Sequence, residues 1–279
     1  MRLLIITQYY WPENLRINDL TTDLVNRGHE VTVLTGVPNY PSGRIFPEFQ
    51  SSPKSFLTFN GVKVIRVPII PRGKRNIQLF FNYLSFIITA STIGLFRLRK
   101  QHFDAVFVFQ PSPVTVCLPA VLYRYLTKTP VAFWVLDLWP ETLKALGVVR
   151  SKRVLGLIGY LVSFIYNRND LVLGQSKSFL PNIQKYCKHD HIRYFPGWAE
   201  SVFSNGMSKS QSTGADDGIF NVTFTGNIGE SQDFPAILDA AERLKNDKMI
   251  RWTIVGDGRM FHWVKDQVEK RGLVDYVSL

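Results

Sequence analysis

The chain has 279 residues, of which 46% are hydrophobic, so it can bury one large core or two ordinary ones. With 33 Lys and Arg against 22 Asp and Glu, its net charge of +11 favours nucleic acid, an anionic membrane or a phosphorylated ligand as a partner. The two cysteines, Cys117 and Cys187, exclude a disulfide framework and a cysteine metal motif, and they favour a reduced cytoplasmic compartment.

The N-terminal part of the chain predicts alternating strands and helices. The first apolar run is too short for a secretory signal and predicts a strand at residues 3–7. Leucines spaced along residues 15–25 predict a helix that ends at Gly28. Further strands are expected at residues 31–35, 62–67, 105–109 and 131–136. Strands separated by helices indicate an α/β fold with a parallel sheet and right-handed crossovers.

The loop after the first strand is a candidate ligand site. It lacks the glycines of a dinucleotide-binding loop, and the chain has no P-loop, so dehydrogenase and NTPase functions are disfavoured. Glu13, Asn14 and Arg16 nevertheless stand at a helix N-terminus beside the carboxyl edge of the sheet. Asn14 suits a structural helix cap equally well. Residues 36–53, rich in Pro, Gly, Asn and Ser, predict a functional loop.

The longest apolar segment, residues 77–96, is bracketed by basic residues. These are Arg72, Lys74 and Arg75 before it and Arg97, Arg99 and Lys100 after it. The segment is long enough to span a bilayer, but six polar residues interrupt it. We therefore expect a helix that packs one face on the domain and inserts the other into an anionic membrane surface, with a plain core helix and a transmembrane helix as alternatives. A second apolar helix, residues 154–166, is a further candidate for this role.

The stretch from Val131 to Glu141 places two carboxylates near the end of a buried strand. Its apolar run, rich in β-forming residues, predicts a parallel strand that ends at Asp137. Pro140 and Glu141 suit the first turn of a helix, which Gly147 ends. Open α/β sheets bind ligands at this edge, so Asp137 and Glu141 are catalytic candidates. The alternative is that Asp137 only caps the helix.

The second half of the chain restarts the same pattern after a linker. Residues 205–218 are small and polar and predict a linker between two domains, residues 1–204 and 219–279. A strand at residues 220–225 is followed by a glycine loop and a helix, an arrangement that offers backbone N–H groups to an anion, although an ordinary tight turn has the same pattern. The chain stops inside a further expected strand, so the second domain is expected to be incomplete.

Several motifs together resemble the family 4 glycosyltransferases of GT-B architecture, in which two Rossmann-like domains with parallel sheets face a cleft. The resemblance is closest to the bacterial N-acetylfucosamine-type transferases of capsule, O-antigen and colanic acid synthesis. The motifs follow the family order over nearly the whole chain: Gln8–Glu13, Arg27–Gly36, Pro38–Gly43, Asp137–Glu141, Trp198–Glu200 and Thr225–Gly229. Pro38–Pro41 and Asp137–Glu141 are the motifs most specific to this subgroup.

The resemblance implies that a sugar passes from a nucleotide-diphosphate sugar to a polyprenyl diphosphate-linked sugar with retention of anomeric configuration. It implies no metal and no other cofactor, and a peripheral enzyme on the cytoplasmic face of the bacterial inner membrane. The first domain would bind the acceptor, and the second would bind the donor. Asp137 matches a catalytic position of the family, and Glu141 lies beside it. The expected acceptor-binding residues are Glu13, Asn14, Arg16, Asn39 and Tyr40, and the expected donor-binding residues are Gly226, Asn227, Gly229, Glu230 and Arg259.

The chain also departs from this family. Many members have a lysine shortly after the loop at Gly226, where this chain has Gln232, and their paired glutamates would lie beyond Leu279. The alternative function is therefore a truncated, non-catalytic membrane-associated binding protein. Glycoside hydrolysis by Asp137 and Glu141 is disfavoured because no other sign of a hydrolase is present. A nucleic-acid-binding protein is disfavoured because the basic residues are scattered and form no known motif.

Overall fold

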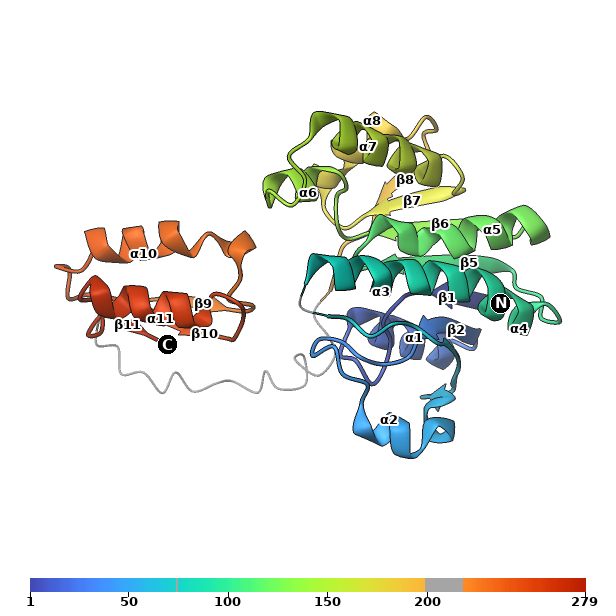
Figure 1. The fold of residues 1–279 in the computed structure, drawn as a ribbon, viewed down its shortest axis with the longest axis horizontal. Coiled ribbons are helices and arrows are strands. Elements are labelled where there is room, and N and C mark those ends of the chain that lie inside the picture. Colours follow the sequence, from blue (N-terminus) through green and yellow to red (C-terminus); the bar gives the residue numbers. More distant parts are fainter. Residues whose placement is uncertain (74, 199–217) are drawn as a thin grey trace. The chain divides into compact units, whose positions relative to one another are not determined.

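The computed structural model describes residues 1–73, 75–198 and 218–279, drawn as a ribbon in Figure 1. Its contacts divide the chain into two compact units, Met1–Gly206 and Met207–Leu279. Except for Gly218, the predicted linker at residues 205–218 lies outside the described residues, as do Lys74, Ala199 and Glu200.

The first unit is built on an eight-stranded sheet. Its strand order is β3-β4-β2-β1-β5-β6-β7-β8, and every neighbouring pair is parallel except β3 and β4. All five strands predicted in this half are present, and β3, β7 and β8 extend the sheet. The strands are β1 Arg2–Ile6, β2 Glu30–Gly36, β3 Thr58–Phe59, β4 Val62–Val67, β5 Ala105–Gln110, β6 Val131–Val135, β7 Leu171–Gly174 and β8 Ile192–Tyr194.

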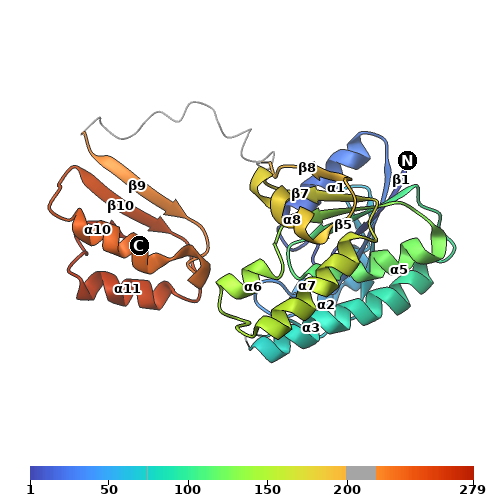
Figure 2. The same ribbon diagram turned by 90° about the horizontal axis from the view of Figure 1, so that it is seen from above.

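Helices cover both faces of this sheet because its central strands are apolar on both sides. One core cluster joins the sheet to α3, α4, α5, α7 and α8, and the other joins it to α1. Figure 2 shows α3, α5 and α7 together on one side of the strands. The helices are α1 Arg16–Asn26, α2 Pro47–Ser51, α3 Asn76–Thr89, α4 Leu95–Leu98, α5 Leu118–Thr127, α6 Glu141–Ala145, α7 Lys152–Tyr166 and α8 Leu180–Tyr186.

The predicted apolar helix is present, but it is not a uniform α-helix. Between α3 and α4, residues Ala90–Gly94 form a π-helical turn. A Cβ atom at Gly94 would lie 2.9 Å from the Leu34 side chain, so glycine allows this turn to approach the sheet closely. By length and composition alone, Ile77–Leu98 could cross a membrane: an 18-residue window within it has a mean hydropathy of 1.6, and only 28% of that window is buried. It therefore packs one side on the sheet and leaves a large apolar side uncovered.

The second unit has a smaller parallel sheet. Its strand order is β11-β10-β9, and helices α10 and α11 supply the apolar residues of its core. The strand, glycine loop and helix predicted at the start of this unit are all present. The elements are β9 Phe220–Thr225, α10 Phe234–Arg243, β10 Ile250–Val255, α11 Phe261–Lys270 and β11 Val277–Ser278.

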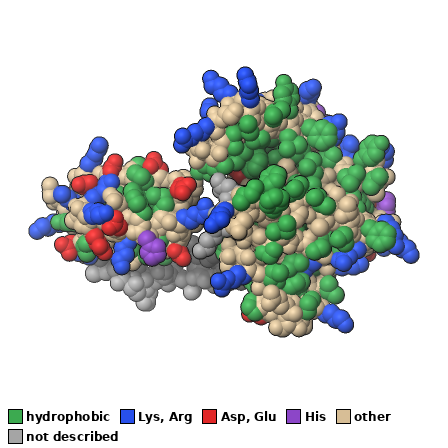
Figure 3. Space-filling model, viewed as in Figure 1, with side chains coloured by type: hydrophobic (Ala, Val, Ile, Leu, Met, Phe, Trp, Pro, Cys, Tyr) green, Lys and Arg blue, Asp and Glu red, His purple; other side chains and the backbone are tan. Residues whose placement is uncertain are grey.

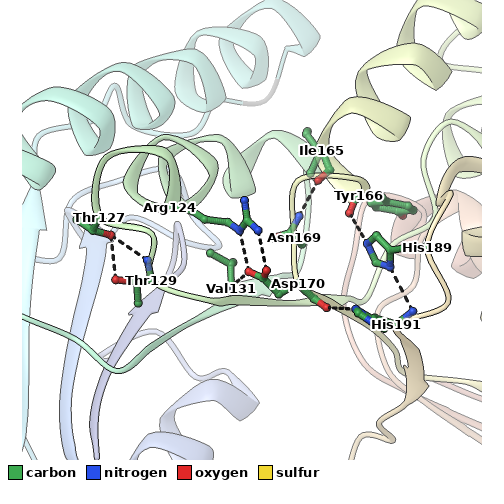
Figure 4. A network of polar contacts seen from close by, with 10 residues as sticks. All are labelled: Arg124, Thr127, Thr129, Val131, Ile165, Tyr166, Asn169, Asp170, His189 and His191. Carbon is green, nitrogen blue, oxygen red and sulfur yellow. Dashed lines mark hydrogen bonds and ion pairs between the residues drawn. The ribbon is translucent and has the colours of Figure 1, made fainter.

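A network of hydrogen bonds lies at the amino ends of the strands of the first sheet (Figure 4). The predicted site lies at the opposite, carboxyl ends. Arg124 of α5 donates two hydrogen bonds of 2.7 Å to Asp170, which precedes β7. The same carboxylate accepts a hydrogen bond of 2.9 Å from the N–H of Val131, the first residue of β6. The hydrogen bonds from Arg124 hold the pKa of Asp170 below its usual value of 3.8. Asp170 thus ties α5 to the starts of β6 and β7.

Replacing Asp170 should have a modest effect that depends on pH. Its side chain is 38% exposed, so Asp170→Asn should lower the free energy of unfolding by only about 1 kcal/mol at pH 7. Because the folded-state pKa is lowered, this stability is present above pH 3.8 and is lost as the pH falls through the folded-state pKa. Denaturant unfolding at pH 7 and pH 3 should show the difference between variant and wild type shrinking at pH 3. Asp23→Asn, which breaks an exposed pair with Arg27, is the control and should cost less. An unchanged difference at pH 3 would contradict this account.

Candidate active site

The candidate site lies at the carboxyl edge of the first sheet, where the loops after the strands meet. Four loops there contain a cis X-Pro bond: Trp11-Pro12 after β1, Tyr40-Pro41 after β2, Ser112-Pro113 after β5 and Trp139-Pro140 after β6. In open parallel sheets this edge is where ligands bind.

Asp137 follows β6 and is held in one orientation by its own loop. One carboxylate oxygen accepts a hydrogen bond of 2.6 Å from the Thr142 hydroxyl, and the other accepts one of 3.0 Å from the Trp139 indole N–H. Gln110 at the end of β5 donates to the Asp137 carbonyl, and Gln175 after β7 donates to the Leu136 carbonyl. Both neighbouring strands therefore fix the backbone that carries this half-buried carboxylate.

Glu141 lies on α6, which starts at this residue, with Pro140 as the residue before the helix. Its Oε1 accepts a hydrogen bond of 3.0 Å from the Tyr186 hydroxyl, whereas its Oε2 is buried and has no hydrogen-bond partner among the described residues. Burial, together with this bond to Glu141, raises the pKa of Tyr186 to about 12. The hydroxyl therefore stays protonated and donates to Glu141. This contact gives Glu141 a structural role beside Asp137.

Glu13 is buried, with 2% of its surface exposed. Its Oε2 accepts a hydrogen bond of 2.9 Å from the Tyr10 N–H, and its Oε1 accepts bonds of 2.8 and 2.7 Å from the N–H groups of Asn39 and Tyr40. Burial nevertheless raises the pKa of Glu13 to about 6. The carboxylate joins the loop after β1 to the loop after β2, so it shapes these loops rather than offering exposed contact atoms.

Arg66 of β4 is a cation whose charge opposes the rise in the pKa of Glu13. It was not among the residues predicted from the sequence. Its guanidinium is buried and donates to the carbonyl oxygens of Gly36, Phe56 and Trp11. Burial lowers the pKa of Arg66 to about 10, and the charge of Glu13 opposes that shift. The available signal was its position in β4, where it follows the buried Val62 and Val64 in the alternation of the strand. Three loops are thus hydrogen-bonded to Glu13 or Arg66, two buried residues of opposite charge.

Asn39 is also buried and acts within the loops. Its side-chain oxygen accepts a hydrogen bond of 2.7 Å from the Arg72 N–H, and its side-chain nitrogen donates to the Val37 carbonyl. Tyr40 is half-buried, and its ring lies 5.1 Å from the ring of Tyr9. The structure therefore brings the expected acceptor-binding residues Glu13, Asn39 and Tyr40 together, but buries the first two.

Asn14 and Arg16 lie at the start of α1, and both are exposed. No side chain caps this helix, whose preceding residue is Leu15, so the alternative role of Asn14 as a helix cap is not observed. The Arg16 guanidinium lies against the backbone of Gly197, where an added Cβ would be 2.1 Å from its Nη1. These two residues stand at the surface of the same loop that Glu13 holds.

The predicted donor loops lie side by side in the second unit. The Gly226 N–H donates to the Val255 carbonyl, the Ile228 N–H to the Asp257 carbonyl, and the Gly229 N–H to the Asn227 carbonyl. The amides of Gly226 and Gly229, which were expected to face an anion, are thus engaged inside the protein. Asn227, Glu230 and Arg259 are exposed, and Arg259 already has a partner within the protein. In the described part of the chain, no group of three or more His, Cys, Asp or Glu is arranged to hold a metal ion.

Substituting a glycine at the contact between these two loops should destabilise the second unit. At Gly256, whose φ is +153°, a Cβ would lie 1.8 Å from the Gly226 carbonyl oxygen, so Gly256→Ala must separate the two loops. We expect a loss of roughly 1–3 kcal/mol in the stability of the second unit, measured by hydrogen exchange of the β9 and β10 amides in the full chain. The control is Gly272→Ala, where φ is +62° and no atom lies within 4 Å of the Cβ. Equal losses in the two variants would contradict the role of the contact.

Comparison with known proteins places these features in a family. A model of the family described as "Glycosyl transferase 4-like domain" matches residues 14–198. "Putative colanic acid biosynthesis glycosyl transferase WcaI" of Escherichia coli (strain K12) is 24% identical over 292 residues, covering 98% of this chain and 70% of that protein. "Probable glycosyltransferase WbjE" of Pseudomonas aeruginosa is 26% identical over 212 residues, covering 74% of this chain and 51% of that protein. The second match thus spans about half of its relative's length.

Solved structures share the fold at low sequence identity. The structure of Anabaena Alr3699/HepE in complex with UDP and glucose matches with a TM-score of 0.57 and 12% identity, covering 100% of this chain and 68% of that one. A trehalose-6-phosphate protein from E. coli bound with UDP-2-fluoro glucose matches with a TM-score of 0.60 and 11% identity, covering 97% of this chain and 69% of that one. At these identities the likeness concerns the fold alone.

Proposed function

Since the chain belongs to the glycosyl transferase 4-like family and has the predicted GT-B fold class, we propose that it transfers a sugar from a nucleotide-diphosphate sugar to a polyprenyl diphosphate-linked sugar. The reaction retains the anomeric configuration and serves bacterial surface polysaccharide synthesis. Two observations support the nature of the substrates. The relatives WcaI and WbjE carry glycosyltransferase names, and the two structural neighbours are bound to UDP or a UDP-sugar.

Asp137 carries the proposal because its carboxylate is oriented at the sheet edge before any ligand binds. Thr142 and Trp139 each hold one oxygen, and Gln110 holds the backbone. A departing nucleotide diphosphate leaves positive charge on the sugar, and a fixed carboxylate stabilises such charge without reorganising. Asp137 either stabilises the sugar in this way or orients the acceptor hydroxyl. Glu141 supports the loop through Tyr186.

The second unit would hold the donor through its exposed loop residues. Asn227 and Arg259 follow β9 and β10 at the carboxyl edge of the smaller sheet. Their amide and guanidinium groups suit the diphosphate, whose negative charge grows as the sugar leaves. Glu230 starts the short turn after the glycine loop and suits a sugar hydroxyl. Gly226 and Gly229 belong to the compact loop that carries Asn227 and leads to Glu230.

A direct transfer assay tests the function. The full chain is incubated with radiolabelled UDP- and GDP-sugars and with membranes that contain polyprenyl diphosphate-linked sugars. The expected result is label in the lipid fraction, which heat-inactivated protein does not give. Anomeric configuration is then determined by NMR of the released product. Binding to the membranes without transfer from any donor would favour the alternative of a non-catalytic binding protein.

A peripheral membrane position is supported by the face that α3, α5 and α7 share. Figure 3 shows hydrophobic side chains gathered on this face of the first unit, with Lys and Arg toward its margin. Residues 76–98, 118–127 and 152–166 contain no Asp or Glu, so the charge of these helices complements anionic lipid. The large apolar side chains exposed on the three helices are Ile77, Phe80, Phe81, Ile88, Leu122, Tyr125, Leu126, Val154, Leu157, Tyr160 and Phe164.

Loss of two charges should weaken membrane attachment. Arg99 and Lys100 are exposed. Near anionic lipid, a basic residue contributes about 1 kcal/mol to the free energy of membrane binding. The double variant Arg99→Gln/Lys100→Gln should therefore bind anionic liposomes at least 10-fold more weakly. Arg97 is left unchanged because it donates to the Arg66 carbonyl. Flotation with liposomes of increasing phosphatidylglycerol content measures the effect. The control, Lys54→Gln/Lys265→Gln, removes two exposed charges elsewhere. Equal flotation of the two double variants would contradict attachment through residues 72–100.

A further inference from the structure

Arg72 is held in place by the loops of the candidate site. Its N–H donates to the Asn39 side chain over 2.7 Å. At Gly43, whose φ is +75°, a Cβ would lie 1.8 Å from the Arg72 carbonyl oxygen, so the loop after β2 closes on this backbone only because residue 43 is glycine. The basic residue that the sequence assigned to a membrane flank is therefore fixed beside the sheet edge.

The side chain of Arg72 lies among three tyrosines. Its guanidinium carbon is 5.3 Å from the centroid of the Tyr40 ring, and its positive charge opposes the rise in the pKa of the Tyr9 hydroxyl that burial causes. Tyr83 of α3 is also close enough to Arg72 for the cation to oppose the rise in its pKa that burial causes. Burial raises the pKa of Tyr9 and of Tyr83, so both phenols are neutral at pH 7. Tyr9 and Tyr83 therefore bring polar but uncharged groups to Arg72.

The cation of Arg72 is half-buried. Across residues 1–73, 75–198 and 218–279, the ion pairs include no carboxylate bonded to Arg72. Arginine remains charged at physiological pH, and removing a charge from water is unfavourable unless it is paired. Among the described residues, the rings and hydroxyls of the tyrosines are the groups that face the cation. Its guanidinium therefore suits an anion that arrives with a ligand.

The position of Arg72 indicates which anion it meets. Tyr83, which interacts with Arg72, is also close enough to interact with Asp137, so the cation lies near the proposed catalytic carboxylate. One turn earlier on the same helix, Phe80 and Phe81 expose 56% and 45% of their surfaces on the apolar face. Three residues of helix span only about 4.5 Å along its axis. A group at Arg72 thus lies between the apolar face and the reacting end of the site.

We infer that Arg72, framed by Tyr9, Tyr40 and Tyr83, binds the diphosphate that joins the lipid of the acceptor to its first sugar. The inference rests on the proposed function, because it assigns that function's acceptor. A guanidinium offers two parallel N–H donors to phosphate oxygens, which a lysine ammonium cannot reproduce. The isoprenoid chain would leave toward α3, and the sugar would extend toward Asp137.

Equilibrium binding to the full chain tests the inference without requiring transfer. The probes are farnesyl diphosphate, farnesyl monophosphate and UDP, measured by calorimetry for wild type, Arg72→Gln and Arg72→Lys. Arg72→Gln should weaken farnesyl diphosphate binding by about 10–100-fold, and Arg72→Lys should recover only part of the loss. Binding of UDP should not change, and wild type should prefer the diphosphate to the monophosphate. Arg44→Gln is the matched control, since Arg44 is an exposed arginine in the neighbouring loop.

Each outcome decides the inference. Farnesyl diphosphate binding that is absent in wild type, or equal in wild type and Arg72→Gln, overturns it even if sugar transfer is observed. An equal loss of UDP binding in Arg72→Gln would assign the cation to the donor and also overturn it. Arg72-dependent binding with no transfer from any sugar donor would sustain the inference while the proposed transferase activity fails. If thermal melts show that Arg72→Gln does not fold, Arg72→Lys decides, and full retention of affinity in that variant overturns the inference.

Discussion

Asp137→Asn should lower turnover by about 10²–10³-fold, the loss typical when a preorganised electrostatic group is removed from a transition state. The variant keeps the size of the side chain and one oxygen that can accept the hydrogen bond from Thr142 or Trp139. Its free energy of unfolding should therefore fall by only about 0.5–2 kcal/mol. The measurements are radiolabelled sugar transfer onto the lipid-linked acceptor and a thermal melt of each variant.

The variant Thr142→Val tests whether Asp137 acts through its charge or through its hydrogen bonds within the loop. Valine has the shape of threonine but cannot donate the 2.6 Å hydrogen bond to the carboxylate. If Asp137 only stabilises the start of α6, Thr142→Val and Asp137→Asn should lose similar stability and keep similar activity. If the charge is catalytic, Thr142→Val should retain most of the turnover that Asp137→Asn loses. A folded Asp137→Asn enzyme with turnover within a few-fold of wild type would leave Asp137 as a structural residue.

Glu13→Ala should lower the free energy of unfolding by at least about 3 kcal/mol, because each unpaired buried donor costs roughly 1–3 kcal/mol. The substitution leaves the N–H groups of Tyr10, Asn39 and Tyr40 without their acceptor. Denaturant unfolding at pH 7 measures the loss. Glu48→Ala is the control, because Glu48 is exposed on α2. Similar losses in the two variants would show that the hydrogen bonds of Glu13 do not hold the loops.

The pH dependence gives a second test of Glu13. Its folded-state pKa of about 6 lies above its usual 4.5, so the folded state binds its proton more tightly than the unfolded state. The resulting stability is present below pH 4.5 and is lost as the pH rises through 6, by roughly 2 kcal/mol for this shift. Glu13→Gln cannot titrate, so its stability curve should lack this slope. Parallel curves for wild type and Glu13→Gln between pH 4 and 7 would contradict the raised pKa.

The elements that sequence reasoning located share a simple physical cause. Buried parallel strands are nearly continuous apolar runs, so Ala105–Gln110 and Val131–Val135 stand out from their surroundings. Strands β7 and β8, with four and three residues, are too short to give such a signal. The π-helical turn at Ala90–Gly94 was also not predicted, since the apolar pattern of a helix continues through it.

The candidate site was only partly predictable, because its geometry depends on loops that meet across the sheet edge. The end of an apolar strand and a following proline located Asp137. Burial of Glu13 depends on amides from another loop and on Arg66 from a third segment, none of which is adjacent in sequence. Arg72 was grouped with a basic flank, because nothing in the local sequence shows that three tyrosines surround it.

The bonding of Glu13 and Arg66 also affects how the surface of this site can change in evolution. Both residues contact the loops through backbone atoms, so the fold of these loops does not depend on the identity of most side chains they display. Substitutions at exposed positions such as Asn14 and Arg44 should therefore leave the fold of these loops unchanged. A graft of residues 38–43 from another member of the family should keep its shape only where the recipient retains Glu13 and Arg66.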